Sequence, residues 1–226
     1  MKKSLLFSAA LSSVILFSFS NSSFANTAAS NTVSAASSTV ENAGINTSNP
    51  DTLIKGMVEN VVASIKQHKL NQGQGQIKKI AELIDDKIMP YADLETTTKM
   101  VMGPHWAKST PEQRSLIMKE FKHLLIATYA GALSKVNDQK INYKPLRILP
   151  NDTKVIVKST IVDQGDTKSL DYRLHKVGNE WKIYDLNVLG IGLVASYRTD
   201  FNEQANKNGI DGLIKFLQAK NKKQYS

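Results

Sequence analysis

Residues 154–188 read KVIVKSTIVDQGDTKSLDYRLHKVGNEWKIYDLNV, and their apolar side chains recur at every second position. The apolar positions that alternate with polar or charged neighbours are Val155, Val157, Ile161, Leu170, Tyr172 and Leu174. Gly165 and Gly178 lie between the apolar runs, where β-hairpin turns are expected. Together with residues 140–149 and 180–189, the pattern predicts four antiparallel strands, with one apolar face that must be covered.

Helical periodicity lies on both sides of this predicted sheet. Before it, apolar spacing predicts helices over residues 50–68, 77–88 and 93–102, and a longer helix that contains Leu116 to Leu133. Ser109, with Glu112 three residues later, has the pattern of a capping box that begins the longer helix. After the sheet, helices are predicted around Leu193–Phe201 and Leu213–Leu217, separated by Gly209. Helices, then a sheet, then helices predict an α+β fold.

Residues 1–25 have the order of features found in a secretory signal peptide. Lys2 and Lys3 are followed by an apolar run, and Ser23 and Ala25 supply small residues at the third and last positions before a cut after Ala25. The run is shorter than the ~20 residues that a membrane-spanning helix needs. Residues 26–50 are rich in Asn, Ser, Thr and Ala and predict a disordered linker. Residues 51–226 have the length of one domain.

Composition excludes several functional classes. The precursor has 29 Lys plus Arg against 20 Asp plus Glu, and removal of Lys2 and Lys3 still leaves a basic chain. The basic residues are dispersed and form no stripe interleaved with aromatic residues, so nucleic-acid binding is not predicted. The absence of cysteine rules out a lipid-modified cysteine, thiolate metal sites and a cysteine nucleophile. The basic excess fits an encounter with anionic lipid surfaces or acidic proteins, and equally a merely soluble surface.

The sequence offers no start for a catalytic or metal site. Its histidines are His68, His105, His123 and His175, and none has metal-ligand spacing. No GxSxG turn or phosphate-binding glycine loop occurs. We therefore expect no catalytic residue, no metal and no resident cofactor.

Three segments together resemble the MlaC family, also called toluene-tolerance proteins. The first contains Met102-Gly103-Pro104-His105-Trp106, then Pro111-Glu112-Gln113-Arg114, Phe121 and Tyr129-Ala130. The second is Glu180-Trp181-Lys182-Ile183-Tyr184-Asp185, which resembles the last strand of the family. The third contains Val194, Tyr197-Arg198, Phe201 and Gly209-Ile210-Asp211-Gly212-Leu213, which resembles its C-terminal helices. The match extends over about residues 90–217.

The resemblance implies a soluble phospholipid carrier of the periplasm in a Gram-negative bacterium. The implied fold is a cone of the cystatin-like or nuclear-transport-factor-like kind, in which helices wrap a twisted sheet around an apolar cavity. The implied cargo is a diacyl phospholipid moved between the two membranes, which maintains outer-membrane lipid asymmetry. The implied partners are an outer-membrane lipoprotein–porin complex and an inner-membrane ABC transporter with its lipid-binding subunit. We expect residues 51–226 to form a single, monomeric lipid-carrier domain.

The apolar sheet face and the facing helices supply the candidate lining of that cavity. The candidates are Met100, Leu124, Leu125, Tyr129, Leu133, Val155, Val157, Ile161, Leu170, Tyr172, Leu174 and Ile183. Each of them is also what an ordinary filled core would contain. The hydroxyl groups of Tyr129 and Tyr172 could lie near a lipid ester, or could bond neighbouring backbone. Arg198 could pair with a phosphate, or could hold Asp185 and fix the last helix to the sheet.

Two other functions remain open from the sequence. Cone-shaped α+β folds also host isomerase-like enzymes with a buried carboxylate, for which Asp185 is the candidate here. A periplasmic protein-interaction module with a filled core is the other alternative.

The first prediction concerns export. When the chain is expressed in a Gram-negative host, the mature protein is expected in the periplasmic fraction with Asn26 as its first residue, because Ser23 and Ala25 fit the cleavage grammar. N-terminal sequencing and intact-mass measurement check this. An Ala25→Leu variant should accumulate as the uncleaved precursor, whereas cleavage of that variant at the same bond would contradict the assigned site.

Overall fold

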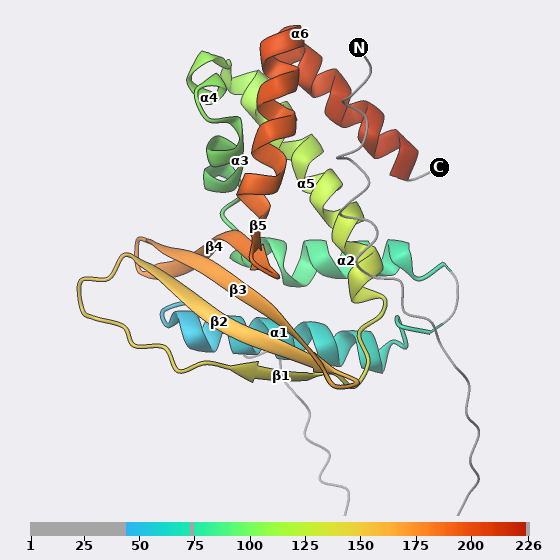
Figure 1. Cartoon of the computed structure of the whole chain (residues 1–226), viewed down its shortest axis with the longest axis vertical. Helices are drawn as coiled ribbons and strands as arrows, with labels where there is room; N and C mark the ends of the chain where they lie inside the picture. The colour runs from blue at the N-terminus through green and yellow to red at the C-terminus, as the bar shows by residue number, and fades with distance from the viewer. Residues whose placement is uncertain (1–43, 73–74, 225–226) are drawn as a thin grey trace, which may run out of the picture. The chain divides into compact units, whose positions relative to one another are not determined.

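The chain is described by a computed structural model for residues 44–72 and 75–224 (Figure 1). The predicted signal peptide and most of the predicted linker lie outside these residues. The elements are α1 (Pro50–Gln67), α2 (Ile77–Lys87), η1 (Met89–Tyr91), α3 (Leu94–Met102), α4 (His105–Lys108), α5 (Pro111–Leu133), β1 (Lys140–Tyr143), β2 (Lys154–Asp163), β3 (Asp166–Val177), β4 (Glu180–Val188), β5 (Ile191–Gly192) and α6 (Leu193–Gln224).

The strands form one antiparallel sheet in the order β1-β2-β3-β4-β5. The predicted count of four is therefore wrong by one strand. The additional strand, β5, pairs with the end of β4 across a tight turn at Leu189 and Gly190, whose φ angles are 53° and 87°. Two residues are too few to show a period of two, so β5 left no pattern in the sequence. β1 ends at Tyr143 and not at 149, since Pro145 cannot donate to a strand ladder.

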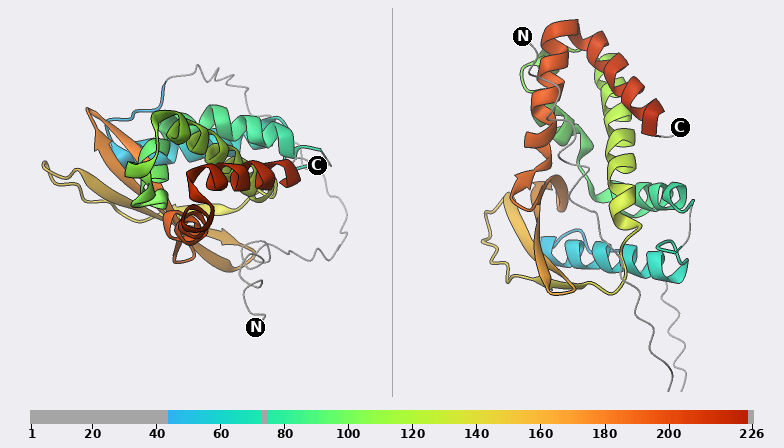
Figure 2. Two further views of the ribbon diagram at one scale, coloured as in Figure 1. Left: turned by 90° about the horizontal axis from the view of Figure 1, so that it is seen from above. Right: turned by 45° about the vertical axis from the view of Figure 1, so that its right-hand side comes forward.

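One end of the sheet's inner face is covered by α1. The side chain of Asn49 accepts hydrogen bonds from the backbone N–H groups of Asp51 and Thr52, and Pro50 occupies the first turn, so the helix begins where the sequence predicts. The helix lies across β2 and β4 (Figure 2). Residues before it are also fixed, because Thr47 accepts a hydrogen bond from the backbone N–H of Trp181 and donates one to Glu180.

The capping box of α5 forms one residue later than predicted. Thr110, not Ser109, is the N-cap: its side chain accepts from the N–H of Gln113, whose side chain accepts from the N–H of Thr110. Ser109 is engaged elsewhere, because its hydroxyl donates to the carbonyl of His105 at 2.8 Å and ends the short helix α4. The predicted start of the helix is correct, but the predicted residue pair is not.

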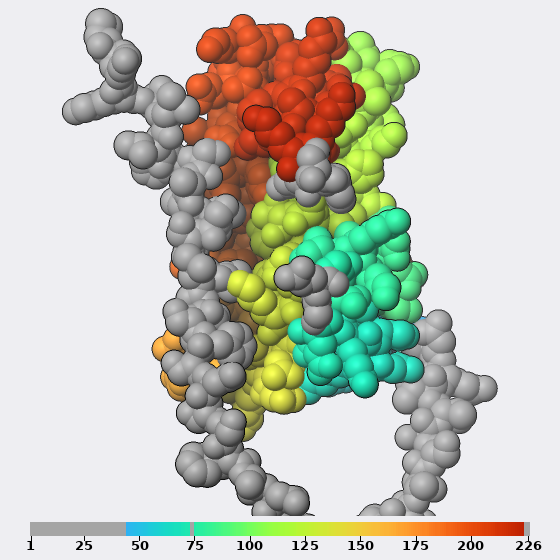
Figure 3. Space-filling view, turned by 90° about the vertical axis from the view of Figure 1, so that its right-hand side faces the viewer, coloured from blue at the N-terminus to red at the C-terminus, as the bar shows by residue number. Residues whose placement is uncertain are grey.

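The C-terminal helix α6 is broken as predicted at Gly209, whose φ and ψ are 69° and −176°. Its first half packs on α3 and α5. Its second half returns along α5, and Figure 3 shows α6 beside α5 on one face of the molecule. A left-handed φ is accessible to glycine at little cost, which explains a break at this position. The two halves and α5 build a helical layer on the sheet.

The segment leading into α3 is attached to the free edge of β4. Ala92 bridges Ile183 in parallel, and the backbone N–H of Asp93 donates to the Ile183 carbonyl at 2.7 Å. The Asp93 carboxylate then caps α3 through the N–H of Thr96 and lies 2.8 Å from Nε2 of His175 on β3. Asp93 thus joins one helix to two strands.

The second prediction concerns this joint. Burial alone would raise the pKa of the Asp93 carboxyl, but the N–H and hydroxyl groups of Thr96 together with His175 hold that pKa below its ordinary value. A lowered pKa means that the ionised group stabilises the fold above about pH 4 and loses this effect as the pH falls further. Asp93→Ala should lower the free energy of unfolding by about 1–2 kcal/mol at pH 7.

Urea unfolding across a pH series measures this effect. The difference between parent and Asp93→Ala should shrink between about pH 5 and pH 2. Asp86→Ala, at an exposed carboxylate on α2, is the matched control and should change stability by less than about 0.5 kcal/mol. A deficit of Asp93→Ala that is constant with pH would contradict the role of the charge.

Candidate functional site

The first cluster of buried apolar residues lies between α1 and the inner face of the sheet. This α1–sheet cluster consists of Leu53, Ile54, Met57, Val155, Val157, Tyr172, Leu174, Trp181 and Ile183. Val157 and Leu174 have no exposed surface, because the α1 side chains cover them. Five of the predicted lining residues therefore pack here as protein core: Val155, Val157, Tyr172, Leu174 and Ile183.

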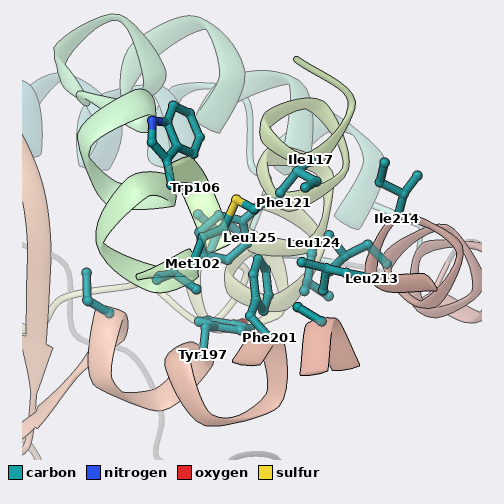
Figure 4. Packing of buried hydrophobic residues seen from close by; sticks show 14 of the residues in the cluster. Met102, Trp106, Ile117, Phe121, Leu124, Leu125, Tyr197, Phe201, Leu213 and Ile214 are labelled. Carbon is teal, nitrogen blue, oxygen red and sulfur yellow. The ribbon is translucent and has the colours of Figure 1, made fainter. Parts of the chain in front are cut away.

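The second cluster lies within the helical layer (Figure 4). The rings of Phe121, Tyr197 and Phe201 meet edge to face, with the centroid of Phe121 5.1 Å from that of Tyr197 and 4.9 Å from that of Phe201. Two predicted lining residues, Leu124 and Leu125, belong to this helical cluster and are nearly fully buried. Two more, Met100 and Tyr129, pack against it while keeping some exposed surface.

A third cluster joins α1, α2 and α5. It consists of Val61, Ile65, Leu70, Ile80, Ile84, Ile126 and Ala130, and the predicted lining residue Leu133 packs at its border. A domain of this size usually has one contiguous core with small satellites. Here the apolar interior is divided into three bodies.

Several apolar side chains that pack at the edges of these clusters, or lie on the same sheet face, are covered only in part. We define the junction as Tyr129, Leu133, Ile161, Leu170 and Leu186, all partly buried. Leu186 packs against both the α1–sheet cluster and the helical cluster. Tyr129 and Leu133 are one turn apart on α5, and Ile161 and Leu170 lie on the sheet face that carries Val157 and Tyr172. α5 packs mainly on α6, α2 and α3, and less on the strands (Figure 2).

Uncharged hydroxyl groups accompany this apolar surface. Burial raises the pKa of Tyr129 above its ordinary value, and the nearby Tyr197 and Asp185 raise it further. Burial also raises the pKa of Tyr172, with Tyr143 adding to the effect and Ser159 opposing it. Burial, with Glu59 and Asp51, raises the pKa of Tyr143 to about 12. All three phenols are therefore protonated at neutral pH and can act as hydrogen-bond donors without a charge.

The buried carboxylate of Asp185 has a structural position. One oxygen accepts from the backbone N–H of Val194 at 2.9 Å in the first turn of α6, and the other lies 3.2 Å from Nη1 of Arg173. Both contacts stabilise the negative charge. The first turn of α6 favours an anion at a helix N-terminus, and Arg173 supplies the opposite charge. The isomerase-like alternative places an acid inside a cavity, with Asp185 as the candidate, and here both oxygens of Asp185 are engaged in holding β3 and α6.

Arg198 bonds the end of α3 and not Asp185, the partner that its structural interpretation offered. Its Nε and Nη2 atoms donate to the carbonyl of Met100 at 3.0 and 2.7 Å, which joins α6 to the end of α3. Arg173 takes the place beside Asp185. The sequence contained one usable signal, since Arg173 and Asp185 lie on neighbouring predicted strands.

Within residues 44–72 and 75–224, no group of three or more metal-ligating side chains comes together. The same part of the chain contains no helix that combines the length and the apolar character needed to cross a bilayer. The fold and interior define a class: α+β domains in which helices cover one face of an open antiparallel sheet around an apolar interior.

Comparison with known proteins identifies the family within this class. The family model described as "MlaC protein" matches residues 55–219, and the chain belongs to that family. The intermembrane phospholipid transport system binding protein MlaC of Haemophilus influenzae is 26% identical over 185 residues, covering 79% of this chain and 85% of that protein. Toluene tolerance protein ttg2D of Pseudomonas putida is 23% identical over 168 residues, covering 74% and 78%.

A solved structure is also similar. The phospholipid-binding protein from Ralstonia solanacearum, in complex with a phospholipid, superposes with a TM-score of 0.73 at 40% identity. The match covers 79% of this chain and 99% of that one. The predicted family and the predicted mixed α and β fold are confirmed.

The third prediction separates core from junction with two identical substitutions on β3. Leu174→Ala should cost about 2–5 kcal/mol of unfolding free energy, because it leaves a cavity in the α1–sheet cluster. Leu170→Ala should cost about 1 kcal/mol or less, because its side chain is already partly exposed. Urea unfolding of lipid-free protein measures both. Equal losses would show that the junction is packed as tightly as the core.

Proposed function

We propose that this chain is a soluble phospholipid carrier of the periplasm, which shuttles lipids between the outer and inner membranes and so maintains outer-membrane lipid asymmetry. The observation that carries the proposal is the similarity, along almost the whole length of that protein, to a structure described as holding a phospholipid. The relative from Haemophilus influenzae, named for intermembrane phospholipid transport, supports the same role.

The acyl chains are proposed to contact the partly buried members of the predicted lining. These are Met100, Tyr129, Leu133, Ile161 and Leu170, and Leu186 joins them. Val155, Val157, Tyr172, Leu174, Ile183, Leu124 and Leu125 form the walls behind. Transfer of one methylene out of water is worth ~0.8 kcal/mol, so two acyl chains require enclosure worth on the order of 20 kcal/mol. Only an interior between sheet and helices, not a surface groove, meets that requirement.

The polar groups of the interior suit a neutral ester region. The hydroxyl groups of Tyr129 and Tyr172 are donors without charge, and Asp185 is neutralised by Arg173 and the start of α6. The phosphate head group is therefore proposed to stay near solvent. Arg198 is occupied by the Met100 carbonyl and is proposed as a structural residue, not a head-group ligand.

The role is proposed to be binding and transfer without catalysis, without metal and without a resident cofactor. The proposed route runs from an outer-membrane lipoprotein–porin complex to an inner-membrane ABC transporter with its lipid-binding subunit, or in reverse. A cleaved signal peptide would release residues 26–226 as a diffusing monomer, since the chain has no cysteine for lipid attachment.

The fourth prediction tests the cargo. Native mass spectrometry of gently purified protein should show an added mass equal to one diacyl phospholipid. Ile161→Asp and Leu170→Asp should each reduce the loaded fraction at least tenfold, because a carboxylate beside acyl chains is strongly unfavourable. Tyr129→Phe should load almost normally, because one hydrogen bond is worth only about 1 kcal/mol against the burial of two tails.

Ile156→Asp is the matched control, because Ile156 lies on β2 with 42% of its surface exposed and alternates onto the opposite face from Ile161. It should load like the parent. Circular dichroism establishes that each variant is folded. Parent protein found bare under conditions that preserve lipid complexes would contradict the carrier and favour a filled-core interaction module.

A further inference from the structure

One end of the sheet combines exposed apolar side chains with cations. It is formed by the β1–β2 connection, residues 144–153, and by the tip of the β3–β4 hairpin, residues 176–180, which extend together at the same end of the strands (Figures 1 and 2). We call these two segments the basic–apolar end. Its exposed apolar residues are Ile148, Leu149 and Val177, with 36%, 55% and 47% of their surface accessible.

These side chains are held outward by ordered backbone. Leu146 packs against the α1–sheet cluster and anchors the β1–β2 connection. Beyond it, Leu149 and Asp152 close a turn: the N–H of Leu149 donates to the Asp152 carboxylate at 2.8 Å, and the N–H of Asp152 donates to the Leu149 carbonyl at 3.0 Å. The N–H of Lys176 donates to the Thr153 carbonyl at 2.9 Å and joins the two segments.

Cations surround the apolar tips. Lys144, Arg147 and Lys176 are exposed, and none of them forms an ion pair with any residue that the structure describes. Lys154 adds a fourth exposed positive charge at the start of β2, where its Nζ lies 6.0 Å from the centroid of the Tyr184 ring.

The local acids do not cancel this charge. Asp152 and Glu180 are outnumbered by the four cations, and Glu180 also lies 3.5 Å from Lys182. The basic–apolar end therefore keeps a positive excess.

We propose that the basic–apolar end docks on the surface of an anionic phospholipid bilayer. Lys144, Arg147, Lys154 and Lys176 face the lipid phosphates, while Ile148, Leu149 and Val177 enter the boundary between head groups and acyl chains. Charge complementarity selects a negatively charged surface. Exposed apolar side chains on projecting turn tips suit insertion into a fluid interface only 5–10 Å deep. A protein partner would need a shaped, well-packed contact area, which two narrow tips do not offer.

The proposed contact is independent of what the interior carries, because none of its residues belongs to the junction. It adds a membrane-docking surface to a carrier that must reach both membranes. If the interior held no lipid, the basic–apolar end would still have the same charge and exposure.

The test is co-sedimentation of the mature chain with phosphatidylcholine vesicles that contain about one third phosphatidylglycerol, and with vesicles of phosphatidylcholine alone. The parent should bind the anionic vesicles, and the binding should weaken as salt is added. The double variant R147Q/K176Q should bind roughly twentyfold more weakly, at about fivefold per lost cation. The double variant I148S/L149S should lose about tenfold at unchanged charge.

Two variants on α2 and α5 match these changes away from the basic–apolar end. K78Q/K79Q removes two exposed charges, and I77S/L116S removes two apolar residues with 45% and 42% exposure. Both should bind within about twofold of the parent. Native mass spectrometry of every preparation records cargo loading separately, so failure of docking and failure of the carrier function are distinguishable.

The proposal is wrong if the parent does not prefer the anionic vesicles, or if the α2 and α5 variants lose as much binding as those at the basic–apolar end. Unchanged vesicle binding of R147Q/K176Q and I148S/L149S would also overturn it. The basic–apolar end would then suit an acidic protein partner instead of a bilayer.

Discussion

Three consecutive residues of β4, Ile183, Tyr184 and Asp185, join the helices α3 and α6 to the sheet, and the buried carboxylate of Asp185 makes two of these contacts. We call these contacts the β4 joint. A register shift between β3 and β4 at Arg173 and Leu174 sets Asp185 opposite Arg173, while one carboxylate oxygen receives the first turn of α6. The two preceding carbonyls, of Ile183 and Tyr184, accept from Asp93 and Thr97 at the start of α3. A bulge redirects side chains and backbone groups in this way. Two helices thus leave the sheet from one short stretch of strand.

This joint determines what the interior can be. α3 and α6 are attached at β4, and α5 packs mainly on them and on α2. α1 covers the inner face of β2, β3 and β4 with Leu53, Ile54 and Met57. The junction side chains, which neither α1 nor the helical layer covers fully, stay partly exposed. Apolar surface left partly exposed inside a fold is unfavourable in water, and an apolar ligand removes that cost. On the proposed carrier function, binding follows from the spacing of the layers more than from any single residue.

The sequence predicted the elements well because their signals are local. The Asn49 cap, the break at Gly209 and the alternation along β2 and β3 each depend on a few neighbouring residues. The errors arose where distant residues compete. Ser109 had the right spacing for a capping box but bonds His105 instead. Arg198 bonds Met100, and Asp185 pairs with Arg173. The motif residues that revealed the family are largely structural: Gln113 completes the α5 cap, and the Arg114 guanidinium stacks 5.0 Å from the Trp106 ring.

Tertiary contacts also explain why the sequence named twelve lining candidates but did not divide them into buried core and partly exposed junction. A period of two places Leu170, Tyr172 and Leu174 on one face, yet it does not tell which of them an α1 side chain will cover. That depends on where α1 lies on the sheet and where the β4 joint holds α3 and α6, on which α5 packs. Both positions are set by tertiary contacts, which a strand pattern does not contain. Leu174 became core and Leu170 stayed partly exposed, although they are the same residue four positions apart on one strand. In this fold the strand pattern supplies the apolar surface, and the positions of α1 and of the helical layer decide which part of it stays partly exposed, where we propose that the lipid binds.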